Sequence, residues 1–158
     1  MIKEDFQKIQ SCGKYNPILN KAFLVSCFLN ESLVKPLWEY NFYSLDNNTT
    51  YTFIIDNDDA ILKDSGSLMN LKKNPEPLSL VNIKLNEKEA IALAKYHLVK
   101  KYNEENISKI IISIDHEKTI LWNITVVLKN LNIINLRIND KNSEVMDSKL
   151  VSPFNFIK

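Results

Sequence analysis

The chain has 158 residues and a mass of 18.3 kDa, which suits one average domain or two small ones and excludes a large multidomain enzyme. Apolar residues make up 45% and charged residues 25%, so the composition is that of a globular protein and not of a disordered chain. The formal net charge is +1, and Arg137 is the single arginine among 20 basic residues, which argues against nucleic-acid recognition through bidentate contacts.

The first half of the chain predicts a short helix followed by three or four strands. Ile2, Phe6 and Ile9 recur at helical spacing, and Gly13 suits a helix C-cap because glycine tolerates the left-handed conformation. Apolar and aromatic runs then predict strands at 22–29, 37–45 and 50–55.

The second half predicts the same plan. Asn86 is a candidate helix N-cap with Glu89 three residues later, and apolar residues at helical spacing follow, so we expect a helix over 86–102. Isoleucine-rich and alternating segments then predict antiparallel strands at 107–115, 119–128 and 133–139, with a short fourth segment at 144–146.

A common offset relates the two halves. Trp38 is followed 18 residues later by Asp56, and Trp122 is followed 18 residues later by Asp140, with 84 residues between the two tryptophans. We therefore predict an α+β fold of two repeated units, each a helix packed on a curled antiparallel sheet of three to four strands. The predicted units cover 1–64 and 85–158, and 65–84, which contains Gly66, Pro75 and Pro77, is the expected linker.

The strand and turn motifs of the second half resemble those of the PepSY family. They are Trp122-x-Ile124-x-Val126, the return strand Leu136-x-Ile138, and Asp140-x-Asn142-x-Glu144-Val145, with Ser143 where the family usually has glycine. The resemblance covers 85–147 best and 1–64 more faintly. It implies tandem cystatin-like domains of the kind found in peptidase propeptides and cell-envelope proteins, which bind or restrain peptidases.

Localisation depends on whether Met1 is the true start of the protein. The chain begins with a helical pattern and has no long apolar segment, so we expect a cytoplasmic protein if Met1 is native. If the chain is a trimmed form, an extracytoplasmic or membrane-anchored protein is expected instead. Cys12 and Cys27 are interpreted as free thiols, with a single disulfide as the alternative.

Few groups are candidates for catalysis or metal binding. His97 is interpreted as a helix-surface residue and His116, between Asp115 and Glu117, as part of a solvated turn; a metal or acid-base cluster is the alternative. The acidic run at 56–59 is interpreted as a hairpin turn and not as a calcium loop, because the glycine and glutamate that such a loop needs are missing. The sequence predicts no cofactor, no metal and no enzymatic activity.

An aromatic face on the first predicted sheet is the candidate partner-binding surface. If Trp38, Tyr40, Phe42 and Ile54 face the helix, strand alternation turns four other residues away from it. These are Tyr43, Tyr51, Phe53 and Ile55. Tyrosine is enriched in protein interfaces, so we predict that this face docks a protein or peptide; the alternative is that the linker, the tail 151–157 or the other unit covers it.

Three functions follow from these observations. The leading hypothesis is a non-enzymatic, PepSY-like binding module for a protein or peptide, acting as a peptidase inhibitor or envelope regulator. The second is a cytosolic interaction protein, such as an immunity or adaptor protein. The third is an enzyme that uses dispersed carboxylates such as Asp115 and Glu117.

Overall fold

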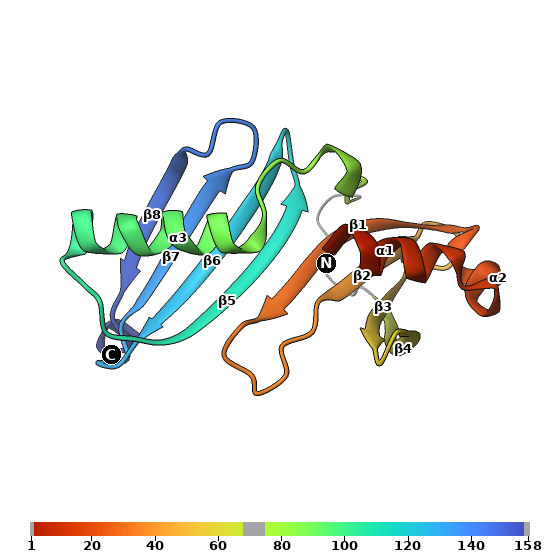
Figure 1. The fold of residues 1–158 in the computed structure, drawn as a ribbon, viewed down its shortest axis with the longest axis horizontal. Coiled ribbons are helices and arrows are strands. Elements are labelled where there is room, and N and C mark those ends of the chain that lie inside the picture. Colours follow the sequence, from red (N-terminus) through yellow and green to blue (C-terminus); the bar gives the residue numbers. More distant parts are fainter. Residues whose placement is uncertain (1, 68–74, 157–158) are drawn as a thin grey trace.

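A computed structural model describes residues 2–67 and 75–156, and in it eight strands form one antiparallel sheet (Figure 1). The strand order is β4-β3-β2-β1-β5-β6-β7-β8. The first four strands are β1 (Ala22–Asn30), β2 (Glu39–Ser44), β3 (Thr49–Asp56) and β4 (Asp59–Ser67). The last four are β5 (Ile107–His116), β6 (Ile120–Leu128), β7 (Ile133–Asn139) and β8 (Val145–Val151).

Three α-helices accompany the sheet: α1 (Ile2–Ser11), α2 (Asn16–Leu19) and α3 (Glu87–His97). Helix α1 lies over the first four strands and α3 crosses the last four (Figure 1). Short 3-10 turns occur at Gly13–Tyr15, Leu80–Asn82 and Pro153–Phe156, and a π turn, Leu98–Tyr102, continues α3. Within the residues that the structure describes, no helix is long and apolar enough to cross a bilayer.

The predicted fold class of two repeated helix-on-sheet units is wrong, because the structure has one continuous sheet. Strand β1 pairs with β5 over five residue pairs, from Ser26 opposite Asp115 to Asn30 opposite Ile111. A strand-to-strand ladder of this length satisfies backbone groups that separate sheets would leave at open edges. The fold is therefore dominated by a single eight-stranded sheet and is not a pair of small three- to four-stranded units.

Helix α3 begins and continues as the sequence predicts. The Asn86 side chain accepts a hydrogen bond from the Glu89 backbone at 3.0 Å, and the Glu89 carboxylate accepts one from the Asn86 backbone at 2.9 Å, which completes a capping box. The helical segment ends after Tyr102, where Asn103 adopts the left-handed conformation. The predicted range of 86–102 is confirmed.

The predicted role of Gly13 is wrong. Neither of the chain's glycines has a positive φ, and Gly13 begins a 3-10 turn after α1. The first helix ends instead through backbone contacts, in which the Cys12 amide donates to the Ile9 carbonyl at 3.2 Å. The Cys12 carbonyl then accepts from the Tyr15 amide at 3.0 Å, so the helix passes into the next turn without a left-handed residue.

One hydrophobic core lies between the sheet and the two longer helices. Trp38 and Trp122 are both buried and meet edge to face with ring centroids 6.3 Å apart. On the α1 side, Phe6 stacks on Phe42 with a centroid distance of 6.0 Å. Buried isoleucines of β5 connect the two regions, since Ile114 lies opposite Cys27 in the ladder and also opposite Trp122.

The opposite face of the sheet carries polar side chains that bond across the strands. Thr52 donates to Asn41 at 2.8 Å, and Asn41 donates to Ser26 at 3.1 Å, so one chain of hydrogen bonds crosses β3, β2 and β1. Farther along the same face, Thr125 donates to Asn135 at 2.9 Å. These cross-strand hydrogen bonds stabilise a polar surface on the side of the sheet away from the helices.

The expected linker, 65–84, has its ends in the described residues, whereas 68–74 lie outside them. Residues 65–67 belong to β4. After the gap, the Leu78 amide donates to the Leu24 carbonyl at 2.8 Å, and Leu78, Leu80 and Ile83 are buried in the core. The division into units at 1–64 and 85–158 stays a prediction.

Candidate partner-binding site

The four residues predicted to form an aromatic outer face do not lie on one face of the sheet. The register places Tyr40 opposite Phe53 and Phe42 opposite Tyr51, so Tyr51 and Phe53 point to the helix side. Phe53 is fully buried and packs edge to face on Phe42, with centroids 5.5 Å apart. The predicted placement of Tyr51, Phe53 and Ile55 is therefore wrong.

Tyr43 alone of the four lies on the outer face. It is buried against Phe23, with centroids 6.0 Å apart, and its hydroxyl donates to the Asn48 side chain at 2.7 Å. Tyr51 keeps part of its surface exposed and accepts from Asn47 at 2.9 Å. A partner-binding role for this set stays a prediction.

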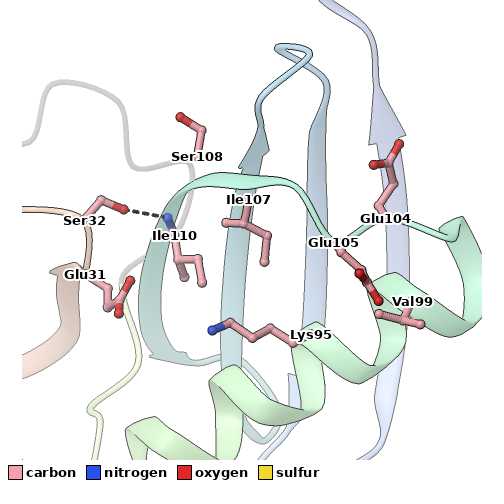
Figure 2. A pocket seen from close by; sticks show the side chains of 9 residues that line it. All are labelled: Glu31, Ser32, Lys95, Val99, Glu104, Glu105, Ile107, Ser108 and Ile110. Atoms are coloured by element: carbon pink, nitrogen blue, oxygen red, sulfur yellow. Dashed lines mark hydrogen bonds between the residues drawn. The ribbon is translucent and has the colours of Figure 1, made fainter.

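A groove on the helix side of the sheet, where β1 ends and α3 passes over the start of β5, is the best-formed candidate (Figure 2). Its volume is about 450 Å³. The sequence analysis missed it, because its walls come from two parts of the chain, 31–32 and 95–110, that are distant in sequence. The lining residues are Glu31, Ser32, Lys95, Val99, Glu104, Glu105, Ile107, Ser108 and Ile110.

The floor of the groove is apolar and its rim is charged. Figure 2 shows Ile107 and Ile110 in the middle, with Glu31 on the side of β1 and Glu105 beside Val99 on the side of α3. Ile110 is buried, Ile107 is half-buried, and Val99 is exposed. This combination binds a ligand that has both an apolar stem and a polar end.

The charges around the groove are not neutralised by neighbours. Glu31, Glu104, Glu105 and Lys95 form no hydrogen bond or ion pair through their side chains within the described residues. Three carboxylates and one ammonium leave a local excess of negative charge. The groove therefore attracts a cationic group more strongly than an anionic one.

The backbone at the groove includes a strand end without a neighbour on one side. The last pair between β1 and β5 is Asn30 opposite Ile111, so 107–109 extend beyond β1. The chain leaves the sheet at Glu31, whose amide donates to the Ile110 carbonyl at 3.1 Å, and the Ser32 hydroxyl accepts from the Ile110 amide at 3.0 Å. A bulge leaves Ser108 without a partner in the β6 register as well.

The loop that follows Ser32 presents two adjacent apolar side chains to solvent. Leu33 is 56% exposed and Val34 is fully exposed, while most large apolar residues of the chain are buried. Pro36 restricts the backbone where the loop returns to the sheet, and Lys35 beside it forms an ion pair with Asp56. An apolar pair held outward in this way is typical of a protein-contact surface.

A second pocket, of about 510 Å³, lies on the outer face over β1, β2, β3 and the end of β5. It contains Asp115, Glu117 and His116, the residues of the alternative acid-base cluster. Asp115 accepts from Asn123 at 2.8 Å through one oxygen, and its other oxygen is buried without a partner. Burial, and secondarily the charge of Glu117, raise the pKa of Asp115.

The other two residues of that cluster each have a partner outside it. Glu117 forms an ion pair with Arg137 at 2.8 Å. His116 lies 3.0 Å from the Pro77 carbonyl oxygen and 3.6 Å from the Glu76 carboxylate. His116 thus connects Glu76 and Pro77 to the end of β5. Its side chain is half-buried.

His97 belongs to a cluster of polar side chains around Ser148 of β8. Its Nε2 lies 3.1 Å from the Ser148 hydroxyl, which also lies 2.6 Å from Lys101 Nζ and 3.0 Å from the Tyr102 hydroxyl. A hydroxyl has one proton and two lone pairs, so three partners satisfy it fully. Burial and the charge of Lys101 lower the pKa of His97. The cluster fastens the end of α3 and its π turn to the edge strand.

The acidic run at 56–59 forms the hairpin turn that the sequence predicts. Asp56 and Asp59 pair across the β3–β4 hairpin, and Asn57 and Asp58 both have positive φ values, as a two-residue type I′ turn requires. Lys8 bonds to Asp58 at 2.6 Å and lowers the pKa of that carboxyl. Over residues 2–67 and 75–156, no group of three His, Cys, Asp or Glu residues is placed to hold a metal.

The two cysteines are free, as the sequence predicts. Cys27 is buried in the core and Cys12 is half-buried. Burial raises the pKa of the Cys27 thiol, which keeps it protonated and unreactive at neutral pH.

Comparison with known proteins identifies the fold and leaves the family open. No family model and no curated protein matches the chain. Among solved structures, a protein of Clostridium difficile 630 described as a putative lipoprotein has a TM-score of 0.61 with this chain. The two are 17% identical, and the match covers 93% of each chain, so they share the fold.

Proposed function

We propose that the chain is a non-enzymatic binding module for a protein or peptide, and that it contacts its partner through the groove of Figure 2 and the adjoining loop. The observation that carries this proposal is a groove with an apolar floor and a charged rim that lies beside exposed Leu33 and Val34. Exposed apolar side chains on a restricted loop gain free energy when a partner buries them, and little ordering entropy is lost.

Two further considerations support the class of partner and the location. The resemblance of the second half to PepSY domains supports a peptidase as the target, with the loop and groove as the inhibitory or regulatory contact. The shared fold with a protein described as a putative lipoprotein supports an envelope-facing location for this chain. Both belong to the proposal and are open to direct test.

The test is site-specific photo-crosslinking of the full chain in its own cells. A photoreactive residue replaces Val34, and a matched control carries the same residue at Met146, an exposed apolar position on β8. We expect one discrete adduct from position 34 that is absent from position 146. No adduct from position 34, or the same adducts from both positions, would contradict the proposal.

The same cells separate the two locations. Recovery of the adduct with the membrane fraction, with a peptidase as the crosslinked protein, is expected for the envelope regulator. Recovery with a soluble cytosolic protein would reject that version and favour the adaptor or immunity protein. Stoichiometric inhibition of the crosslinked peptidase, lost on Val34→Asp, then distinguishes an inhibitor from a substrate.

A further inference from the structure

We infer that the occupant of the groove is an extended basic segment of the partner, with a lysine or arginine side chain seated over Ile107 between Glu31 and Glu105. This inference rests on the proposed binding function and specifies its ligand chemistry.

The first support is charge. Glu31, Glu104 and Glu105 surround the groove and have no ion-pair partner among the residues that the structure describes, and Lys95 is the one cation among the lining residues. Bringing a cation into this group places it near uncompensated carboxylates, whereas an anion would meet an unfavourable field. The excess of carboxylates thus selects a basic segment over an acidic one.

The second support is the shape and polarity of the floor. Ile107, Ile110 and Val99 form an apolar surface below the charged rim. Lysine and arginine carry apolar stems that pack on such a surface while their charged ends stay near the carboxylates. A short polar cation would leave this floor uncovered, so the floor favours a long basic side chain.

The third support is the free strand end. Residues 107–109 of β5 lie beyond the last pair with β1, and Ser108 has no cross-strand partner in either register. Ile107 and Lys109 pair with β6, and the Ile107 amide donates to the Glu105 carbonyl at 2.9 Å, so a peptide that follows the line of β1 past Asn30 meets the backbone of Ser108 as its pairing group, as in strand addition. Pairing of this kind requires an extended segment and fixes the direction in which alternate side chains point.

The experiment measures the anisotropy of a fluorescent, acetylated peptide in which lysine alternates with valine, titrated with the full chain. A matched peptide replaces each lysine with glutamate, and a third carries N-methyl groups on the backbone amides. We expect binding of the lysine peptide that weakens several-fold when salt rises from about 50 mM to about 200 mM. The glutamate and N-methyl peptides should bind at least about tenfold more weakly.

Variants of the chain give effects of opposite sign. Glu31→Gln and Glu105→Gln should each weaken binding of the lysine peptide about threefold, because each removes the attraction of one exposed carboxylate. Lys95→Gln should strengthen binding about twofold, because it removes the repulsion. Asp147→Asn, which removes a carboxylate from β8 at the far edge of the sheet, is the matched control and should leave binding unchanged.

Undetectable binding, equal binding of the lysine and glutamate peptides, or weakening by Lys95→Gln would each overturn the inference. The proposed function fails separately, through the absence of a crosslinked partner at position 34. A partner captured there whose contact survives Glu31→Gln combined with Glu105→Gln would keep the function and reject the basic segment as the ligand.

Discussion

The two tryptophans at the centre of the core stand at matching places in the sequence but are held by different partners. Trp122 donates to Asp140, which lies 18 residues later, at 2.9 Å. Trp38 has Asp56 at the same spacing, yet it donates to Glu87 at 3.1 Å, on the first turn of α3. Asp56 instead forms an ion pair with Lys35 at the surface.

The difference shows that one sequence pattern serves two structural roles. Asp140 is buried and also accepts from the Lys84 amide at 2.8 Å and from the Leu85 amide at 3.0 Å, directly before the N-cap of α3. Asp140 therefore connects the residues directly before α3 to the turn after β7. Trp38, by bonding to Glu87, connects the first four strands to the same helix, so both tryptophans stabilise the position of α3.

The largest effect is expected when this buried carboxylate is removed. Asp140→Ala leaves three donors without their partner, and each buried unsatisfied donor costs roughly 1–3 kcal/mol. With partial rehydration we expect a loss of about 3–5 kcal/mol in the free energy of unfolding, measured by urea denaturation. A loss below about 1 kcal/mol would show that Asp140 does not hold the helix entry.

Asp140→Asn is the matched control for size. An asparagine can keep the carbonyl oxygen toward Leu85 and Trp122, but its amide group then faces the Lys84 amide, which is also a donor. We expect a loss of about 2 kcal/mol, between those of wild type and Asp140→Ala. An equal loss for the two variants would show that the retained carbonyl oxygen contributes nothing to stability.

The partner of Trp38 should matter less, because it is only partly buried. Glu87→Ala leaves the indole N–H without its acceptor and removes an acidic residue from the first turn of α3. The expected loss is about 1 kcal/mol in urea unfolding. Lys88→Ala, on the next position of the same turn, should change stability by less than about 0.5 kcal/mol. A Glu87→Ala loss as large as that of Asp140→Ala would remove the distinction between the two tryptophans.

Replacing Asp115 should increase the free energy of unfolding, because burial of its charged carboxylate is unfavourable. Because the pKa of Asp115 is raised, the folded state holds the proton more tightly than the unfolded chain does. The contribution of this group to stability is therefore complete below about pH 3.8 and falls as the pH rises through the raised pKa. Asp115→Asn keeps an acceptor for Asn123 and should stabilise the protein by about 0.5 kcal/mol at neutral pH, after solvent screening. The gain should vanish near pH 3; a gain that does not depend on pH would contradict the role of the charge.

The sequence predicted the local elements well because their signals are local. The capping box of Asn86 and Glu89, the isoleucines of β5 and the Asn57-Asp58 turn each specify their own conformation. The joining of the sheets by β1 and β5 was not predictable, because strand pairing across 80 or so residues has no local signature. The groove depends on that pairing and was missed for the same reason.

One error had a readable signal. In 50–53, threonines alternate with Tyr51 and Phe53, and this alternation marks the aromatic side chains as the core face. Grouping Ile54 with Tyr40 and Phe42 reversed the face of the whole strand, because the side-chain period is two. The exposed pair Leu33-Val34 and the adjacent Glu104 and Glu105 were visible too, but only their proximity in the fold gives them a joint role.

The smallest effect is expected at Asp56, and it completes the comparison with Asp140. In the pair with Lys35, the lysine is exposed and Asp56 is half-buried, and ion pairs this open to solvent contribute little because water and salt screen them. Asp56→Asn should change the free energy of unfolding by less than about 0.5 kcal/mol, with the difference from wild type lost at high salt. The hairpin should persist, because Asn57 and Asp58 set its turn. If Asp56→Asn instead destabilised the chain as much as Asp140→Asn does, the two aspartates would have the same structural role. The distinction between a buried carboxylate that holds α3 and a surface ion pair would then be wrong.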